Sequence, residues 1–189
     1  PELNNAFCVT VISNATLPER IDALPTVSQP AQCDLATLLL RSLESWEEIG
    51  SDNLLAGLVQ HCDWTIMYES NGYIGATPEL MQPLSAGRRS LFITAAELVL
   101  LSVVDGESRT WFDTLFAAER NGSTPDELMP LMRQIGGFEL EPDGSAKRTE
   151  FHCHEATFAL CDTVTGLRLT PHLLRDTIFT VVIARRTLV

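Results

Sequence analysis

Apolar residues recur along the chain with two different periods, which predict different elements. Phe7, Val9 and Val11 alternate with smaller residues, and this period of two predicts a strand over residues 6–12. Asp34 precedes residues 35–49, in which leucines, a tryptophan and an isoleucine recur every three or four positions. This pattern predicts an amphipathic helix with Asp34 as its N-cap.

The segment from Leu54 to Ala76 changes its periodicity at Asp63. Residues 54–62 have apolar side chains at helical spacing and predict the end of a helix, whereas the alternation from Trp64 to Tyr68 predicts a strand. Asn71-Gly72 then favours a type I′ turn, because both central residues of that turn need a positive φ. We therefore predict a hairpin that follows a helix.

The rest of the chain alternates between helical and strand patterns. Helical patterns cover residues 77–82, 94–104, 108–120 and 123–135, and strand patterns cover residues 147–160 and 178–188, with a helical turn at Thr170-Pro171 between them. The sequence therefore predicts an α+β fold with a mostly antiparallel sheet and helices packed on one face. Residues 13–32 contain three prolines, and residues 1–33 are predicted to be an N-terminal strand and linker ahead of a single domain at 34–189.

The predicted order from Leu54 onward is strand, turn and strand, then helices, then an antiparallel hairpin. In architecture this order resembles the sensory folds of the PAS and GAF type. The resemblance implies a domain that senses a ligand or regulates a partner, and it says nothing about particular residues.

The charge of the chain limits its partners. The 189 residues carry a formal net charge of −12, and no Lys or Arg lies between Arg41 and Arg88. Nucleic acid is excluded as a direct partner, because binding a phosphate backbone requires a basic surface. The acidic residues from Glu44 to Glu79 instead suggest a surface for a basic protein, although an ordinary solvated acidic face is the simpler explanation. The longest apolar run, Leu98 to Leu101, is too short to span a membrane.

Five cysteines are present, an odd number without the close, regular spacing of a disulfide framework. This favours a reducing compartment and predicts an intracellular, cytoplasmic location. The sequence contains no glycine-rich phosphate loop, Gly-x-Ser-x-Gly, Cys-x-x-Cys or His-Glu-x-x-His motif, and it identifies no cofactor. An enzyme is therefore the less favoured class.

His152 and His154 are the strongest candidates for metal ligands. If residues 147–160 form a strand, both imidazoles project from one face roughly 7 Å apart and can reach one metal ion. Cys161 is the predicted third ligand, with His61 and Cys62 as alternatives. The competing interpretation is a half-exposed strand with two surface histidines.

A thiol enzyme is a further hypothesis. Its nucleophile would be Cys62 or Cys153, and a catalytic base and an orienting carboxylate would complete the site. The candidate bases are His152, His154 and His172, and the candidate carboxylates are Asp63 and Glu155. Cys62 also fits the apolar face of its predicted helix, where it would be inert packing.

Aromatic residues suggest a cavity between sheet and helices. The predicted ligand-binding residues are Trp64, Tyr68, Trp111 and Phe116, within a larger set that includes Phe92, and the competing interpretation is that they form the core. The leading hypothesis is a non-catalytic regulatory domain that acts through a small apolar ligand, a protein partner or a homodimer. An acidic chaperone or inhibitor and a Cys/His enzyme or zinc protein are the alternatives.

Overall fold

The computed structural model describes residues 7–14, 16–48, 52–70, 73–94, 99–138, 140 and 152–186. An eight-stranded sheet, antiparallel at every pairing, forms its centre in the order β2-β8-β3-β4-β1-β5-β6-β7. The strands are β1 (Phe7–Ser13), β2 (Ala31–Asp34), β3 (Asn53–His61), β4 (Trp64–Ser70), β5 (Arg89–Thr94), β6 (Val99–Val104), β7 (Glu107–Asp113) and β8 (Ile178–Arg185).

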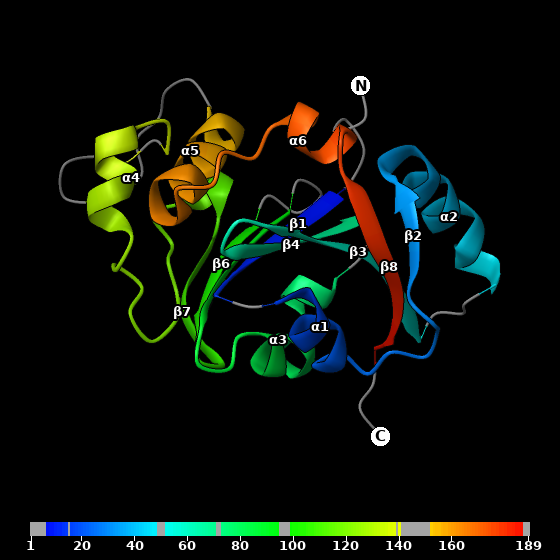
Figure 1. Ribbon diagram of the computed structural model, residues 1–189. Helices are drawn as coiled ribbons and strands as arrows, with labels where there is room; N and C mark the ends of the chain where they lie inside the picture. The colour runs from blue at the N-terminus through cyan, green and yellow to red at the C-terminus, as the bar shows by residue number, and fades with distance from the viewer. Residues whose placement is uncertain are drawn as a thin grey trace.

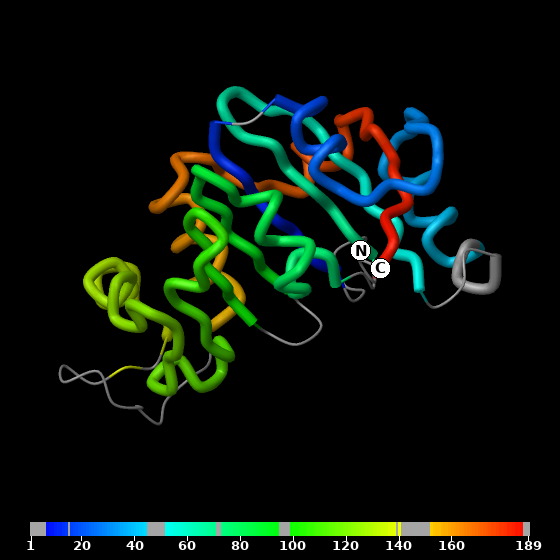
Figure 2. Tube along the Cα trace, turned by 90° about the horizontal axis from the view of Figure 1, so that it is seen from below, coloured from blue at the N-terminus to red at the C-terminus, as the bar shows by residue number. Residues whose placement is uncertain are grey.

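Helices lie on both faces of this sheet (Figure 1). They are α1 (Leu17–Asp22), α2 (Leu35–Glu48), α3 (Pro78–Leu84), α4 (Met129–Ile135), α5 (Cys153–Thr165) and α6 (Pro171–Arg175), with two 3₁₀ turns, η1 (Ile74–Ala76) and η2 (Thr114–Phe116). We call the side that carries α2, α4, α5 and α6 the upper face, and the side that carries α1, η1 and α3 the lower face. Figure 2, seen from below, shows α1 and α3 lying across the sheet, with α4 at one end.

The upper face carries a core rich in aromatic side chains. Tyr68 of β4 lies between Phe7 of β1 and Phe179 of β8, with ring centroids 6.2 Å from each. Phe112 of β7 meets Phe138 edge-on at 6.0 Å. Leu38 of α2 and Leu160 of α5 close this core from above. These large apolar surfaces supply most of the burial that holds the upper helices in place.

The lower face carries a second core, built mostly from aliphatic and methionine side chains. Its buried cluster contains Ile12, Leu24, Leu54, Ala56, Leu58, Met67, Ile74, Leu80, Met81, Leu84, Val103, Val182 and Ala184. The α+β fold with an antiparallel sheet is therefore confirmed, and the helices cover both faces of the sheet where the sequence predicted one.

Three helices and two strands agree with the predictions. The Asp34 carboxylate accepts a hydrogen bond from the Thr37 amide at 2.8 Å and caps α2 as predicted. Thr77-Pro78 and Thr170-Pro171 begin α3 and α6. The predicted strands at residues 6–12 and 178–188 correspond to β1 and β8. The same kind of signal is wrong at Ser123-Thr124-Pro125, which was predicted to begin a helix, because α4 begins only at Met129.

Two segments predicted as helices are strands. Residues 54–61 belong to β3, and residues 99–104, within the predicted 94–104 helix, form β6. Both strands are buried on both sides: Leu55 and Leu100 point into the upper core, while Leu54 and Val103 point into the lower core. A strand covered on both faces has apolar residues in succession and does not alternate, which explains the error.

Residues 108–120, predicted as a helix, form β7 and η2, so that Phe112 and Phe116 do not share a buried face. The opposite error occurs at residues 147–160, predicted as a strand, where α5 begins at Cys153. Its buried positions, Cys153, Ala156, Thr157, Leu160 and Cys161, do follow helical spacing. Small and polar residue types at these positions concealed the helical period.

The predicted hairpin is also wrong in position. Trp64–Tyr68 is a strand as predicted, but it pairs with β3 through a turn at Cys62, whose φ is +50°. The residues from Ile74 onward form η1 in place of a second strand, and Asn71 and Gly72 lie outside the described residues. Residues 1–33 contain α1 and the central strand β1, and β2 spans the predicted domain boundary at 33/34.

Among the described residues, none of the helices combines the length and apolar character that crossing a membrane requires. All five cysteines are free thiols.

Candidate ligand-binding site

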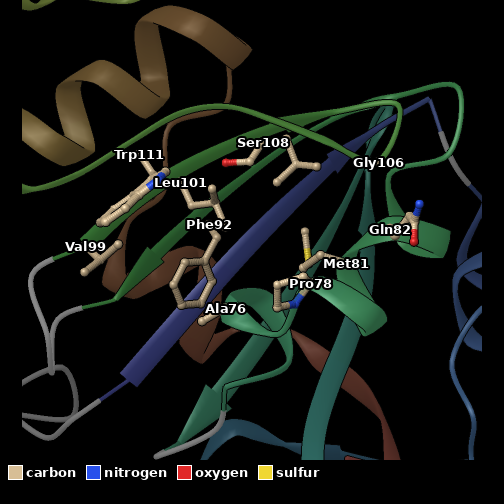
Figure 3. A pocket seen from close by; sticks show the side chains of 11 residues that line it. Ala76, Pro78, Met81, Gln82, Phe92, Val99, Leu101, Gly106, Ser108 and Trp111 are labelled. Atoms are coloured by element: carbon tan, nitrogen blue, oxygen red, sulfur yellow. The ribbon is translucent and has the colours of Figure 1, made fainter. Parts of the chain in front are cut away.

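The lower face is hollowed beside the last three strands of the sheet. Here β5, β6, β7 and the beginning of α3 enclose a pocket of about 280 Å³ (Figure 3). Its lining consists of Ala76, Pro78, Met81, Gln82, Phe92, Val99, Leu101, Val103, Gly106, Ser108 and Trp111. Trp111 and Val99 stand at one end of it, and Gln82 and Gly106 at the other.

The register of the strands aligns the floor of the pocket. Residues directly opposite one another in antiparallel strands place their side chains on the same face. Phe92 of β5 lies opposite Leu101 of β6, which lies opposite Trp111 of β7. A continuous row of apolar side chains therefore crosses the lower face to the last strand.

An irregularity in β7 brings a second position into the pocket. The register between β6 and β7 shifts at Ser102/Val103, so that Ser108 pairs with Val103. Such a bulge adds one residue to a strand and changes the direction of the side chains before it. Ser108 consequently shares the lower face with Val103 and lines the rim of the pocket.

The wall opposite the sheet is α3, which the β6–β7 turn holds in place. The Gly106 amide donates a hydrogen bond to the Ser85 hydroxyl at 3.0 Å. Gly106 has a φ of +77°, and a Cβ at this position would lie 2.8 Å from Cγ of Gln82. The turn thus approaches α3 closely only because a glycine occupies this position.

The chemistry of the pocket is almost entirely apolar. No described residue in its lining is charged, and the Gln82 amide, the Ser108 hydroxyl and the Trp111 indole are its polar side-chain groups. Trp111 is 44% exposed, which is unusual for the largest apolar side chain. The volume of the pocket is near the lower limit for small-molecule sites, so the pocket suits a compact, neutral apolar molecule.

A buried carboxyl lies behind the pocket. Glu69, near the end of β4, is fully buried, and its two oxygens accept hydrogen bonds from the amides of Ile74 (2.7 Å) and Gly75 (3.2 Å). Burial raises the pKa of Glu69 to about 7, because a charged carboxylate loses its hydration there and the two amide hydrogen bonds only partly compensate. Through its hydrogen bonds with these two amides, Glu69 holds η1 against the sheet.

The turn held by Glu69 contacts the pocket directly. A Cβ on Gly75 would lie 2.0 Å from Cδ2 of Phe92 and 2.4 Å from the hydroxyl of Thr10. The backbone of η1 is therefore packed onto the sheet with no space for a side chain. Because Phe92 and Ala76 both line the pocket, the position of η1 determines the shape of the pocket.

Comparison with known proteins identifies a family. A model described as a family of unknown function (DUF6461) matches residues 1–188. The chain belongs to this DUF6461 family. No curated protein and no solved structure matches the chain significantly, so the resemblance to PAS and GAF folds stays a prediction.

In this member of the DUF6461 family, the four predicted ligand-binding residues lie apart. Trp111 lines the pocket, whereas Tyr68 is buried in the upper core, where desolvation raises its pKa to about 12. Trp64 lies at the β3–β4 turn, and Phe116 is 58% exposed on η2. The structure thus brings only one of the four to the pocket, together with Phe92 from the wider aromatic set.

The predicted metal ligands are not brought together. His152 and His154 lie at the start of α5, where side chains two positions apart point to nearly opposite sides, so the strand geometry behind the prediction is wrong. Cys161 is fully buried, and burial raises the pKa of its thiol to about 12. In the described part of the chain, no three or more His, Cys, Asp and Glu side chains form a group that could hold a metal ion.

The residues proposed for a thiol enzyme are also dispersed. Cys153 is buried at the beginning of α5, and His172 lies on α6. Cys62 is exposed in the β3–β4 turn, where His61, Asp63 and Trp64 share a second, more polar depression with Arg168 of the α5–α6 loop. His152, His154 and Glu155 do not line this depression.

The predicted acidic surface is divided between the two sides of the sheet. Glu44 is exposed at the end of α2 on the upper face, and Glu79 is exposed on α3 on the lower face. Glu69 is buried between them. These acidic residues therefore do not form one continuous surface.

Most pocket residues were absent from the sequence prediction. Leu101 and Val103 belong to β6, which was predicted as a helix. The Asp105-Gly106 dipeptide that follows this apolar run is the signal that could have identified a hairpin. Glu69 carries no local signal, because its burial depends on η1 folding back over β4.

Proposed function

We propose that this protein is a non-catalytic regulatory domain that binds a small, neutral, apolar molecule in the pocket of the lower face. The observation that carries the proposal is the exposed Trp111 beside Leu101 and Val99 on the open part of the sheet. Removing apolar groups from water is favourable, so a ligand that covers the exposed apolar groups of a concave surface binds with a favourable free energy.

The polar groups of the pocket support binding in preference to catalysis. Among the described lining residues, the hydroxyl of Ser108 and the amide of Gln82 can donate or accept hydrogen bonds, and neither has a general base beside it in that lining. These groups are suited to orienting a hydroxyl or carbonyl of the ligand. Binding could then be transmitted to a partner through η1 and α3.

The first experiment is a titration with N-phenyl-1-naphthylamine, a neutral apolar probe whose fluorescence rises when it leaves water. We expect saturable binding that Ser108→Phe weakens at least about tenfold, because a phenyl group at the rim would occupy the volume of the pocket. Ser123→Phe is the matched control, since Ser123 is exposed and is not a lining residue. Equal probe affinity in both variants would contradict the proposal.

The class of ligand can be tested by competition. We expect decanol to displace the probe at lower concentration than decanoate, because transferring a carboxylate into an uncharged pocket is unfavourable. Stronger competition by decanoate would instead indicate a cationic group at the mouth of the pocket and would contradict a neutral ligand.

Contact with another protein is the second candidate function. Leu115 and Phe116 on η2 are 38% and 58% exposed, and large apolar side chains of this kind are enriched at interfaces. The occupant most simply tested is a second copy of the chain. Sedimentation coefficients that rise with protein concentration in the wild type, and not in a Phe116→Ser variant, would favour this function.

A further inference from the structure

Glu69 has an unusual environment for an acidic residue. On the lower face it lies opposite Cys8 of β1, which in turn lies opposite Thr94 of β5, and η1 covers it with the amides of Ile74 and Gly75. The Cys8 thiol is the titratable group on the neighbouring strand. Burial and the two amides are the influences on the pKa of Glu69, with no contribution from a described Lys, Arg or His.

The contact between η1 and the sheet joins Glu69 to the pocket. Gly75 donates to Glu69 and presses against Phe92, and the next residue, Ala76, lines the pocket. The Thr10 hydroxyl beneath Gly75 is buried without a hydrogen-bond partner among the described residues. Movement of η1 away from the sheet would therefore hydrate two polar side chains and remove one wall of the pocket.

We infer that η1 is a latch on the ligand pocket, closed by the buried Glu69 carboxyl and opened when Glu69 loses its proton. In the closed state the carboxyl is covered and the pocket has its complete wall. In the open state the carboxylate is hydrated, and Phe92 and Ala76 no longer support a ligand.

Two opposing effects decide whether ionisation of Glu69 opens or closes the latch. An ionised carboxylate would accept the two amide hydrogen bonds more strongly, which favours the closed latch, but its loss of hydration favours the open latch. The pKa of about 7, raised from 4.5, means that the loss of hydration is the larger effect. The closed state therefore holds the proton more tightly, and the open state gains population as the pH rises.

Coupling to the ligand rests on the proposed function. A ligand that contacts Phe92 and Ala76 binds the closed state and should raise the pKa of Glu69 in return, because such coupling is reciprocal. The protein would then respond jointly to the ligand and to pH near neutrality. The latch itself can be tested without any ligand.

The first test measures hydrogen exchange of the Ile74 and Gly75 amides in the wild-type protein between pH 5 and pH 8, corrected for the intrinsic pH dependence of exchange. The opening constant should rise about 70-fold over this range, out of a total of about 300-fold between the fully protonated and the fully ionised carboxyl, because the pKa is near 4.5 in the open state and about 7 in the closed state. The Asn121 amide, which donates to Trp111 far from Glu69, should show no such change.

Low urea concentrations distinguish the latch from unfolding of the whole domain. Local opening exposes little surface, so exchange at Ile74 and Gly75 should depend only weakly on urea. Opening constants that stay the same from pH 5 to pH 8, or that follow urea as steeply as global unfolding, would overturn the inference.

The second test measures the affinity for N-phenyl-1-naphthylamine at pH 6 and pH 8. We expect about a tenfold loss at pH 8 in the wild type, a typical size for coupling between linked sites, and no loss in Glu69→Gln. Glu79→Gln, the same change at an exposed position of α3, is the control and should retain the wild-type dependence. If the wild type binds the probe equally well at both pH values, the coupling is overturned. If it binds the probe at neither pH, the proposed function is contradicted, and the exchange experiment alone decides whether the latch exists.

Discussion

The two faces of the sheet are covered in different ways. On the upper face, α2, α5 and α6 lie on a core of contacting rings, including those of Phe7, Tyr68 and Phe179. On the lower face, α1, η1 and α3 cover only part of the sheet, and the floor formed by β6 and β7 stays open as the pocket. The upper face therefore stabilises the fold, while the lower face has surface available for a ligand.

Buried ionisable side chains distinguish the lower layer further. Arg20 of α1 donates to the Leu84 carbonyl at the end of α3, and Glu69 accepts from the amides at the start of η1. Both are buried, and both hold a helical segment through its backbone. Hydrogen bonds to an ionisable group change strength with its protonation, whereas ring packing does not. The inferred latch at Glu69 therefore lies on the face where a contact depends on protonation.

The largest expected effect concerns the upper core. Phe112→Ala should lower the free energy of unfolding by about 3 to 5 kcal/mol, because Phe112 is fully buried against Phe138. Phe116→Ala should change it by less than about 0.5 kcal/mol, since Phe116 is mostly exposed. Urea denaturation of both variants measures the difference.

This pair also tests the conformation of residues 107–116. In a helix, Phe112 and Phe116 would share one face, and the two substitutions would have similar effects. In the structure, a strand followed by a 3₁₀ turn separates them. Equal losses of stability would contradict β7 and would restore the helix that the sequence pattern suggests.

Helix starts could be predicted from the sequence more readily than the strands buried between the two cores. Helix starts at Asp34, Thr77 and Thr170 were predictable because the capping or proline signal is local. The interior of β3 and β6 was not, because a strand between two cores loses the alternation by which strands are recognised. Its assignment requires knowledge that helices cover both faces of the sheet.

The candidate site was predictable only in its aromatic part. Trp111 and Phe92 belonged to the predicted set, because large apolar side chains are rare and conspicuous. Ser108 enters the pocket through a bulge, and Glu69 is buried by η1, two features that arise from pairing between segments distant in the sequence. No local pattern marks either residue.

The next effect concerns the pH dependence of stability. Folded Glu69 keeps its proton up to about pH 7, whereas in the unfolded chain the proton is lost near the ordinary pKa of 4.5. Between these values the folded state binds more protons, so the free energy of unfolding should fall as the pH rises, by about 3 kcal/mol in total, and then level off. Denaturation between pH 5 and pH 8 measures this slope.

Glu69→Gln should remove that slope, whatever its effect on stability at a single pH. Carboxylates such as Glu127, whose pKa is lowered by hydrogen bonds from Arg89, have the opposite dependence, and they act mainly below pH 5. The difference between wild type and variant therefore isolates Glu69. Parallel pH profiles for the two proteins would mean that Glu69 is not buried as described.

The smallest expected effect compares one substitution on the two faces. A Cβ on Gly57 of β3 would lie 2.5 Å from Cδ2 of Leu38, the end of a flexible side chain, and 3.1 Å from Cβ and Cδ1 of Phe179. A Cβ on Gly75 would lie 2.0 Å from the Phe92 ring and 2.4 Å from the Thr10 hydroxyl, a closer overlap that involves a rigid ring. Gly57→Ala should cost about 1 kcal/mol and Gly75→Ala about 2 to 3 kcal/mol, measured by urea denaturation. Gly75→Ala should in addition weaken binding of the neutral probe, because relief of the overlap displaces η1 or Phe92 from the wall of the pocket. If Gly57→Ala were the more costly of the two, or if Gly75→Ala bound the probe as the wild type does, η1 would not be packed on the sheet closely enough to control the pocket.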